Sequence, residues 1–426
     1  MAVSILLVSA ACLAPAQGPL WAEAPLLYGE AQSQDAIARL DASLAAGEVS
    51  LRPDGEPFAI ERLLDALEVP HVSQTAVFSS ASLQAKRITE ERPRAVYFND
   101  DVYIGFVPGG RFVEAIATDA HEGPVFYSLD RRDPQPRFKR ETHRCLQCHA
   151  PSHTGGLPAH LMRSLTPGPS GAPDFGAGSN HVDPSTPFEK RWGGWYITGA
   201  VGDLEHLGNQ KLAPGEEELR PSNERHRSLA GLCDTSPYPV ATSDVVAVLV
   251  LEHQLHVQNE IVLAAYDARR ALEYQRALNE ALGDPPAHPV ASSQSRLDRA
   301  AQRVVEALIG VAEMPLPGPV GTRSVFARSF QERGRRDGDG RSLRDLDLET
   351  RVFRYPLSYC VESTAMRTMP SELAERVWAR LGELLGETLS PADESAYGAW
   401  LPNGRRQEAA AILRATLDVP AAFQPI

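Results

Sequence analysis

The chain has 426 residues and a formal net charge of −13 at pH 7, from 42 basic and 55 acidic side chains. This acidic balance argues against a nucleic acid or another phosphate-rich partner. With 43% hydrophobic and 23% charged residues, the composition is that of an ordinary globular protein. The five cysteines are too few for a disulfide-stapled scaffold of this length.

Residues 1–16 have the pattern of an export signal. Met1 to Pro15 is almost wholly apolar or small, and this run is too short to span a bilayer. Ala14-Pro15-Ala16 matches the small-residue pattern at which signal peptides are cut. We therefore expect a periplasmic protein. As an alternative, Cys12 would carry a lipid anchor. No later segment predicts a transmembrane span.

Residues 25–130 predict a small α+β region. Leucine and isoleucine recur at helical spacing between Asp35 and Pro70. Four runs rich in β-forming residues follow, at 96–98, 102–107, 112–118 and 125–129, and turn residues separate them. Short strands joined by turns are typical of an antiparallel β meander.

Residues 131–243 predict a loop-rich region, with one strand at 195–201. The segment is rich in Pro, Gly, Ser and His. Long irregular stretches inside a compact protein are usually functional or disordered. Five histidines between His143 and His181 favour a functional site here.

Residues 244–426 predict a mainly helical region. Ser243 is expected to cap a long helix over 244–281, whose first half is apolar on every side and is therefore expected to be buried. Shorter helices are expected at 297–312, 371–385 and 408–417, and another begins at Pro391 after the N-cap Ser390. The predicted fold class is α+β, with an N-terminal antiparallel meander, a loop-rich middle and a helical C-terminal part.

One motif carries the predicted chemistry. Cys145-Leu146-Gln147-Cys148-His149 is a C-x-x-C-H sequence, in which two thiols can add to the vinyl groups of a haem while the histidine binds its iron. We therefore predict one covalent haem c, with Cys145 and Cys148 as its attachment sites and His149 as the proximal iron ligand. An export signal agrees with this prediction, because haem is attached to protein outside the cytoplasm.

Three other interpretations of the motif are a zinc site, a redox dithiol and a chance match. Zinc would need two further ligands at a separation that closes a tetrahedron, and His149 and His153 follow Cys148 too closely. A redox dithiol expects a strand-to-helix setting, which the surrounding loop does not offer. Because export is predicted and haem is attached outside the cytoplasm, a chance match is the weaker explanation of the motif.

The motif resembles that of c-type cytochromes, and most of the chain resembles a family of large, exported bacterial proteins with one haem c and a cytochrome c domain. The similar stretches are residues 97–103, 145–149, 154–156, 189–196, 206–209 and 351–359. The resemblance implies one-electron transfer in the bacterial periplasm or envelope, with a periplasmic redox protein as partner. The chain is longer than a small cytochrome c, and it lacks the second C-x-x-C-H of two-haem peroxidases.

The sequence offers several candidates for the sixth ligand of the iron. A strong sixth ligand closes the iron for electron transfer, whereas a vacant position lets it bind peroxide, oxygen or a substrate. His253 and His256 are three positions apart on one face of the long helix, so either could face the iron. Met369, next to Pro370, is the alternative ligand. Weaker candidates are His181, His206 and Met162.

Two alternative functions follow from an open iron. In a peroxidase-like haem enzyme, His253 or His256 would be the distal acid or base. In a haem-based sensor, a change of ligation would shift a two-state element.

Several further side chains could contact the haem, or could instead lie in the ordinary core or at the surface. Trp192, Trp195 and Tyr196 could pack on the porphyrin edge or in an ordinary core. Arg163 and Arg191 are expected either to bind the haem propionates or to lie at the surface. Cys233 and Cys360 are expected to be free buried thiols, with a disulfide between them as the alternative.

Overall fold

The computed structural model describes residues 18–53, 56–80, 82–174, 176, 179–311 and 313–424. The predicted export signal, including Cys12, lies outside the described residues. The described helices are α1 Ala36–Ala46, α2 Ile60–Ala66, α3 Leu146–His149, α4 Val245–Leu282, α5 Ala291–Leu308, α6 Val325–Glu332, α7 Thr364–Arg367, α8 Ser371–Leu384, α9 Pro391–Tyr397 and α10 Asn403–Thr416. The described strands are β1 Thr75–Val77, β2 Arg94–Phe98, β3 Val102–Phe106, β4 Phe112–Asp119, β5 Gly123–Asp130, β6 Phe138–Arg140, β7 Arg163–Leu165, β8 Ser179–His181 and β9 Trp195–Tyr196.

A seven-stranded antiparallel sheet forms the N-terminal half, in the order β6-β5-β4-β3-β2-β1-β9. Its strands β2 to β5 are the predicted meander, which is confirmed. The sheet is wider than expected, because the short strands β1, β6 and β9 extend it at both edges. Of the strand expected at 195–201, only Trp195–Tyr196 pairs within the sheet. The middle region also contains the small hairpin of β7 and β8.

The two faces of the sheet carry different layers. Successive side chains on a strand point to opposite faces. Tyr97 and Ile104 point to the face that α1 and α2 cover with their own buried leucines and isoleucines. Phe98 and Tyr103 point to the other face and belong to the core that α4 and the C-terminal helices share. The sheet is therefore covered by helices on both sides.

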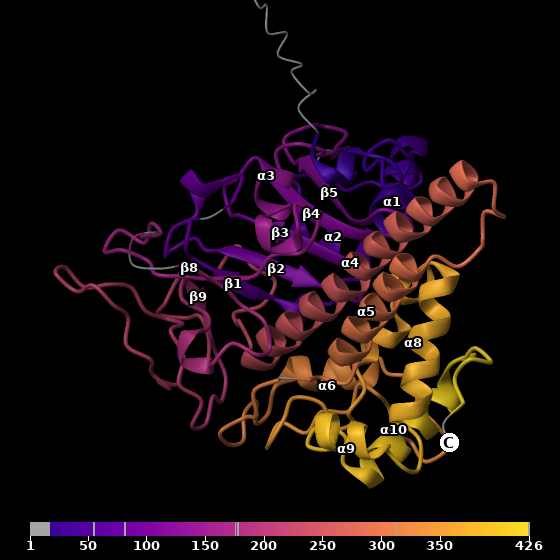
Figure 1. Cartoon of the computed structure of the whole chain (residues 1–426). Coiled ribbons are helices and arrows are strands. Elements are labelled where there is room, and N and C mark those ends of the chain that lie inside the picture. Colours follow the sequence, from indigo (N-terminus) through magenta and orange to yellow (C-terminus); the bar gives the residue numbers. More distant parts are fainter. Residues whose placement is uncertain are drawn as a thin grey trace, which may run out of the picture.

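Helix α4 lies between the sheet and the C-terminal helices, and Figure 1 shows it running diagonally past the strands. Its bounds confirm the predicted long helix, and every residue from Val245 to Leu251 is buried, also as predicted. The predicted N-cap was wrong by one residue. Asp244 caps the helix, accepting a hydrogen bond from the Val246 N–H at 2.8 Å. Ser243 is instead turned toward the sheet, where its Oγ accepts from the Ala76 N–H and donates to the Tyr196 carbonyl.

The C-terminal region is mainly helical, so the α+β fold class is confirmed. Helix α5 packs against both α4 and α8. It starts six residues earlier than the expected 297, at Ala291, and α10 starts at Asn403 rather than at 408. Ser390 caps α9 through the Asp393 N–H, with Pro391 at the first position as predicted. None of the described helices is both long and apolar enough to cross a bilayer.

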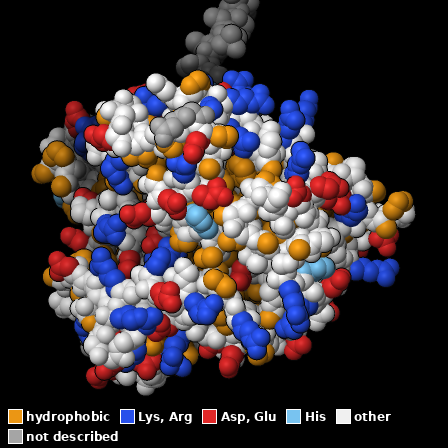
Figure 2. Space-filling model, turned by 180° about the vertical axis from the view of Figure 1, so that it is seen from behind, with side chains coloured by type: hydrophobic (Ala, Val, Ile, Leu, Met, Phe, Trp, Pro, Cys, Tyr) orange, Lys and Arg blue, Asp and Glu red, His pale blue; other side chains and the backbone are white. Residues whose placement is uncertain are grey.

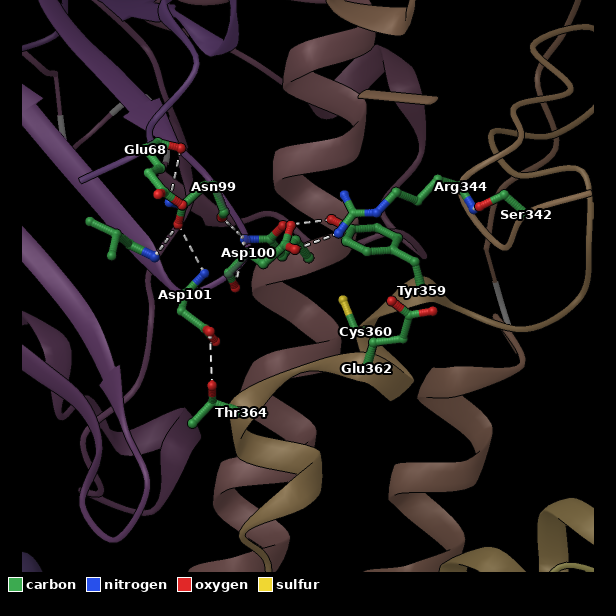
Figure 3. Close-up of polar contacts among 12 residues, drawn as sticks. Glu68, Asn99, Asp100, Asp101, Ser342, Arg344, Tyr359, Cys360, Glu362 and Thr364 are labelled. Carbon is green, nitrogen blue, oxygen red and sulfur yellow. Dashed lines mark hydrogen bonds and ion pairs between the residues drawn. The ribbon is translucent and has the colours of Figure 1, made fainter. Parts of the chain in front are cut away.

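A polar contact joins the sheet to the C-terminal region, as Figure 3 shows. Arg344 forms an ion pair with Asp100, in the turn between β2 and β3. Its guanidinium lies over the rings of Phe330 and Tyr359, at 4.9 and 4.6 Å from their centroids. The neighbouring Asp101 accepts a hydrogen bond from the Thr364 hydroxyl. These contacts fix the turn against helices that lie more than 200 residues further along the chain.

Candidate haem attachment site

The C-x-x-C-H motif forms a single helical turn shortly after β6. The Cys145 carbonyl accepts hydrogen bonds from the Cys148 N–H at 3.1 Å and from the His149 N–H at 2.9 Å. This turn places the two cysteines, three positions apart, on one side of the helix. Both are free thiols; Cys148 is exposed and Cys145 is partly buried. Two free thiols on one side of a single turn, one exposed and one partly buried, fit the attachment of one flat group by two thioether bonds.

The Cys145 thiol does not have the character of a redox nucleophile. Burial raises its pKa to about 12, and the Glu141 carboxylate adds to this effect. Reactive dithiols generally contain a cysteine with a lowered pKa. The environment of Cys145 therefore gives no support to the thioredoxin-type alternative.

His149 is held in the orientation that an iron ligand requires. Its Nδ1 lies 3.0 Å from the Ala159 carbonyl oxygen, and an Nδ1–H that donates there leaves the lone pair of Nε2 available for a metal. The ring packs against Phe126 of β5, with 4.7 Å between centroids. Burial lowers the pKa of His149 to about 4, so the imidazole is neutral at pH 7.

An apolar cluster fixes the motif on the sheet. Leu146, the second residue of the motif, is buried with Tyr28 and Phe126. Cys145 and Ile116 pack at the edge of this cluster. The motif therefore lies on the same sheet face as Tyr103, and the N-terminal segment that contains Tyr28 packs beside it.

The loop that supplies the Ala159 carbonyl is itself anchored to α4. The His160 N–H donates to Asn259 Oδ1 at 2.8 Å, and Asn259 Nδ2 donates to the His160 carbonyl at 3.0 Å. The His160 ring is buried and packs against Tyr103, with 4.7 Å between centroids. Sequence reasoning missed both His160 and Asn259. They are 99 residues apart, and neither belongs to a recognisable motif.

The two helix histidines considered as distal ligands have other surroundings. His253 Nδ1 lies 2.5 Å from Glu313 Oε1, and its Nε2 lies 2.7 Å from Ser358 Oγ. Both ring nitrogens are thus used within the protein, which argues against iron ligation by His253. His256 is partly buried, and burial lowers its pKa while the Asp183 carboxylate opposes this shift. Nothing in these contacts brings His256 to the motif.

The alternative ligand Met369 lies two residues before α8. It lines a small cavity together with His121, Tyr266 and Arg269. This cavity lies beside the turn between β4 and β5, and none of its lining residues belongs to the motif. Met369 itself is buried in the main core, whereas Leu146 of the motif belongs to the cluster of Tyr28 and Phe126.

The weaker histidine and methionine candidates are also placed in the core or in other contacts. His206 is buried against Trp192, and its Nδ1 accepts a hydrogen bond from the Gly208 N–H. His181 packs against His153, with 4.4 Å between ring centroids. Met162 is buried in the main core.

Arg191 is neither a surface residue nor available to a propionate. It is buried, and its guanidinium donates to Glu252 Oε1 at 2.5 Å and to two backbone carbonyls. Trp192 donates to the other oxygen of Glu252 at 3.0 Å, so this tryptophan belongs to a buried polar network. Arg163 of β7 donates to the Ser179 hydroxyl.

The remaining aromatic residues and cysteines are part of the ordinary structure. Trp195 and Tyr196 form β9 and pair with β1. Cys233 and Cys360 are both free thiols, so the alternative disulfide is not formed; Cys360 is buried as expected, whereas Cys233 is only partly buried.

The donor set of the motif fits a covalently attached haem: two free thiols on one turn and one neutral imidazole with an available Nε2. Within the described part of the chain, no group of three or more His, Cys, Asp or Glu side chains is arranged to hold a metal ion. No protein-family model, curated protein or solved structure matches this chain.

Proposed function

We propose that the protein is an exported c-type cytochrome, which holds one haem covalently and exchanges single electrons with a periplasmic redox partner. The observation that carries this proposal is the geometry of His149. Its Nδ1 faces the Ala159 carbonyl, inside a C-x-x-C-H turn whose two cysteines are free. This arrangement supplies the three bonds by which a c-type haem is held.

Each residue of the site has a distinct role under this proposal. Cys145 and Cys148 form the thioethers, and His149 binds the iron from the proximal side. Ala159 orients the imidazole through its carbonyl, while Phe126 packs on the ring. Asn259 holds the loop in place by its two hydrogen bonds to His160. When bound, the haem supplies a one-electron iron couple, whose potential depends on ligation, burial and nearby hydrogen bonds.

Electron transfer is favoured over the peroxidase-like alternative. The alternative gave the distal acid–base role to His253 or His256. Both nitrogens of His253 are occupied by Glu313 and Ser358. The charged and titratable groups that act on His256 are Asp183, His253, Glu313 and His181, none of which belongs to the motif. The proposal therefore assigns no substrate chemistry to these histidines.

Export and the redox partner belong to the same proposal. The export signal at residues 1–16 supports a periplasmic location, and a lipid at Cys12 would place the protein at a membrane surface. Figure 2 shows acidic and basic side chains interspersed over the face turned away from Figure 1. A protein partner docking there would meet charges of both signs.

The attachment of haem is tested by removing the two thiols. The full-length chain is produced in a bacterial periplasm together with a cytochrome c maturation system. We expect haem staining on a denaturing gel and an intact mass increased by one haem for the wild type. The double variant Cys145→Ala/Cys148→Ala should lose both signals, because no thioether can form.

Cys233→Ala is the matched control, since Cys233 is a free cysteine outside the motif. This variant should retain both the stain and the added mass. Wild-type protein without added mass, produced under conditions in which a control cytochrome is loaded, would refute the proposed function.

A further inference from the structure

Arg94 begins β2 on the sheet face that carries the motif. Val96 of β2 pairs with Gly105 of β3, which pairs with Glu114 of β4. Directly paired residues point to the same face, as do residues two apart on one strand. Arg94 and Glu114 therefore share the face on which Phe126 contacts His149.

One N–H donor of the Arg94 guanidinium, that of Nε, is buried and has no hydrogen-bond acceptor among the described residues. Arg94 Nη1 lies 3.4 Å from Glu114 Oε2, which is long for a charged pair. A guanidinium has five N–H donors, and leaving a buried one without an acceptor is unfavourable because its desolvation is not compensated. The arrangement thus calls for an additional acceptor at Arg94.

Glycine at position 105 makes room for this side chain. A Cβ added to Gly105 would lie 3.3 Å from Arg94 Nε and 3.5 Å from Glu114 Cβ. Because the centre of β3 carries no side chain here, the guanidinium can lie directly over the strand. The sheet therefore places Arg94 in a defined position, rather than letting it extend into solvent.

The same face connects Arg94 to the motif. Glu114 lies two residues before Ile116, which pairs with Phe126 and packs in the cluster around Cys145. A group attached at the motif and extending over this sheet face would therefore meet the side on which the guanidinium lies.

We propose that Arg94 binds the propionate carboxylates of the haem. The proposal rests on the proposed function, since it needs a haem held at Cys145 and Cys148. A carboxylate supplies the acceptor that the buried Nε lacks, and a planar guanidinium binds it through two parallel hydrogen bonds. Arg163 and Arg191, the two arginines expected from the sequence to serve this role, donate to other groups of the protein.

The test measures the midpoint potential of the loaded protein and its dependence on pH. We expect Arg94→Gln to lower the potential, because a positive charge near the iron disfavours the ferric state and an unpaired propionate favours it. The propionate pKa should also rise, so that a pH-dependent step in potential moves toward neutral pH. Arg94→Lys should restore most of the potential, since it keeps the charge.

Arg111→Gln is the matched control. Arg111 lies just before β4, is exposed, and pairs with Asp130 at the surface. Its removal should change neither the potential nor the pH-dependent step. Haem staining on a denaturing gel verifies covalent loading of each variant, and far-UV circular dichroism verifies folding. If Arg94→Gln does not fold, the altered pH-dependent step is sought in Arg94→Lys, which keeps the charge and changes the hydrogen bonds.

Two results would overturn the assignment while the proposed function stands. One is a loaded and folded Arg94→Gln whose potential and pH dependence equal those of Arg111→Gln. The other is an altered cyanide affinity with an unchanged potential, which would place Arg94 beside an open iron position instead. Failure of the wild type to hold haem would instead defeat the proposed function itself.

Discussion

His253 is held by two hydrogen bonds, one to Glu313 and one to Ser358. We predict that His253→Ala lowers the free energy of unfolding by about 2 kcal/mol, because two polar partners lose their contacts in a buried setting. The visible spectra of the oxidised and reduced haem should stay unchanged. Chemical unfolding and absorption spectra measure the two effects.

His288→Ala serves as the comparison for this prediction, since His288 is exposed. It should affect neither stability nor spectrum. Loss of a low-spin spectrum in His253→Ala alone would mean that His253 reaches the iron, against the contacts seen in the structure.

Single residues differ in how far a sequence can reveal them. Cys145, Cys148 and His149 are adjacent in the chain, so their spacing alone indicates the chemistry. The Ala159 carbonyl acts through its backbone, which no side-chain pattern records. Arg94 is 51 residues before the first cysteine of the motif, and only the pairing of strands shows that it shares a face with the motif. Contacts of this kind require the fold.

At the scale of elements, the start of α4 depends on two adjacent residues with separate roles. We predict that Asp244→Ala costs about 1 kcal/mol of unfolding free energy, because the Val246 N–H loses its cap. Asp244→Asn should cost little, since asparagine caps equally well. Urea denaturation followed by circular dichroism measures both.

Ser243→Ala is the informative companion to these variants. It removes hydrogen bonds to the Ala76 N–H and the Tyr196 carbonyl, which connect β1 and β9 to the start of α4. It should therefore destabilise the protein by about 1–2 kcal/mol without removing the cap. A neutral Ser243→Ala would show that these contacts add nothing to the edge of the sheet.

Elements with a distinctive run of residues or a cap were predictable, and several short elements without either were not. Helix α4 is recognisable from its long, continuously apolar first half, and strands β2 to β5 from runs of β-forming residues between turns. The short helix α9 is recognisable from Ser390 and Pro391 at its start. Strands β1 and β6 contain three residues each, too few for any alternation to appear, and only two residues of the strand expected at 195–201 pair in the sheet as β9. They are strands because a neighbour offers backbone hydrogen bonds, which is a property of the sheet and not of their own sequence. The eight-residue helix α6 was also missed, because it spans only about two turns.

At the scale of the whole molecule, one hydrophobic core connects regions that the sequence composition separates. The core contains Phe98 and Tyr103 of the sheet, most of the buried face of α4, and residues of α5, α8 and α10. Composition changes near residues 130 and 243 predicted separate regions. Burial instead joins the sheet and the helices on either side of α4, and we therefore expect them to unfold together.

The ion pair between Arg344 and Asp100 offers a test of whether the sheet and the C-terminal helices unfold together. The Arg344 side chain is 6% exposed and that of Asp100 is 44% exposed, so removing the arginine loses packing on Phe330 and Tyr359 as well as the ion pair. We predict that Arg344→Ala costs about 2–4 kcal/mol, whereas Asp100→Asn costs about 1 kcal/mol or less. Urea unfolding is followed by tryptophan fluorescence and by far-UV circular dichroism. Both probes should give one coincident transition in each variant, because the apolar core still joins the two regions. Two separate transitions in Arg344→Ala would contradict this expectation. They would show that the ion pair, rather than the core, makes the molecule unfold as one cooperative unit.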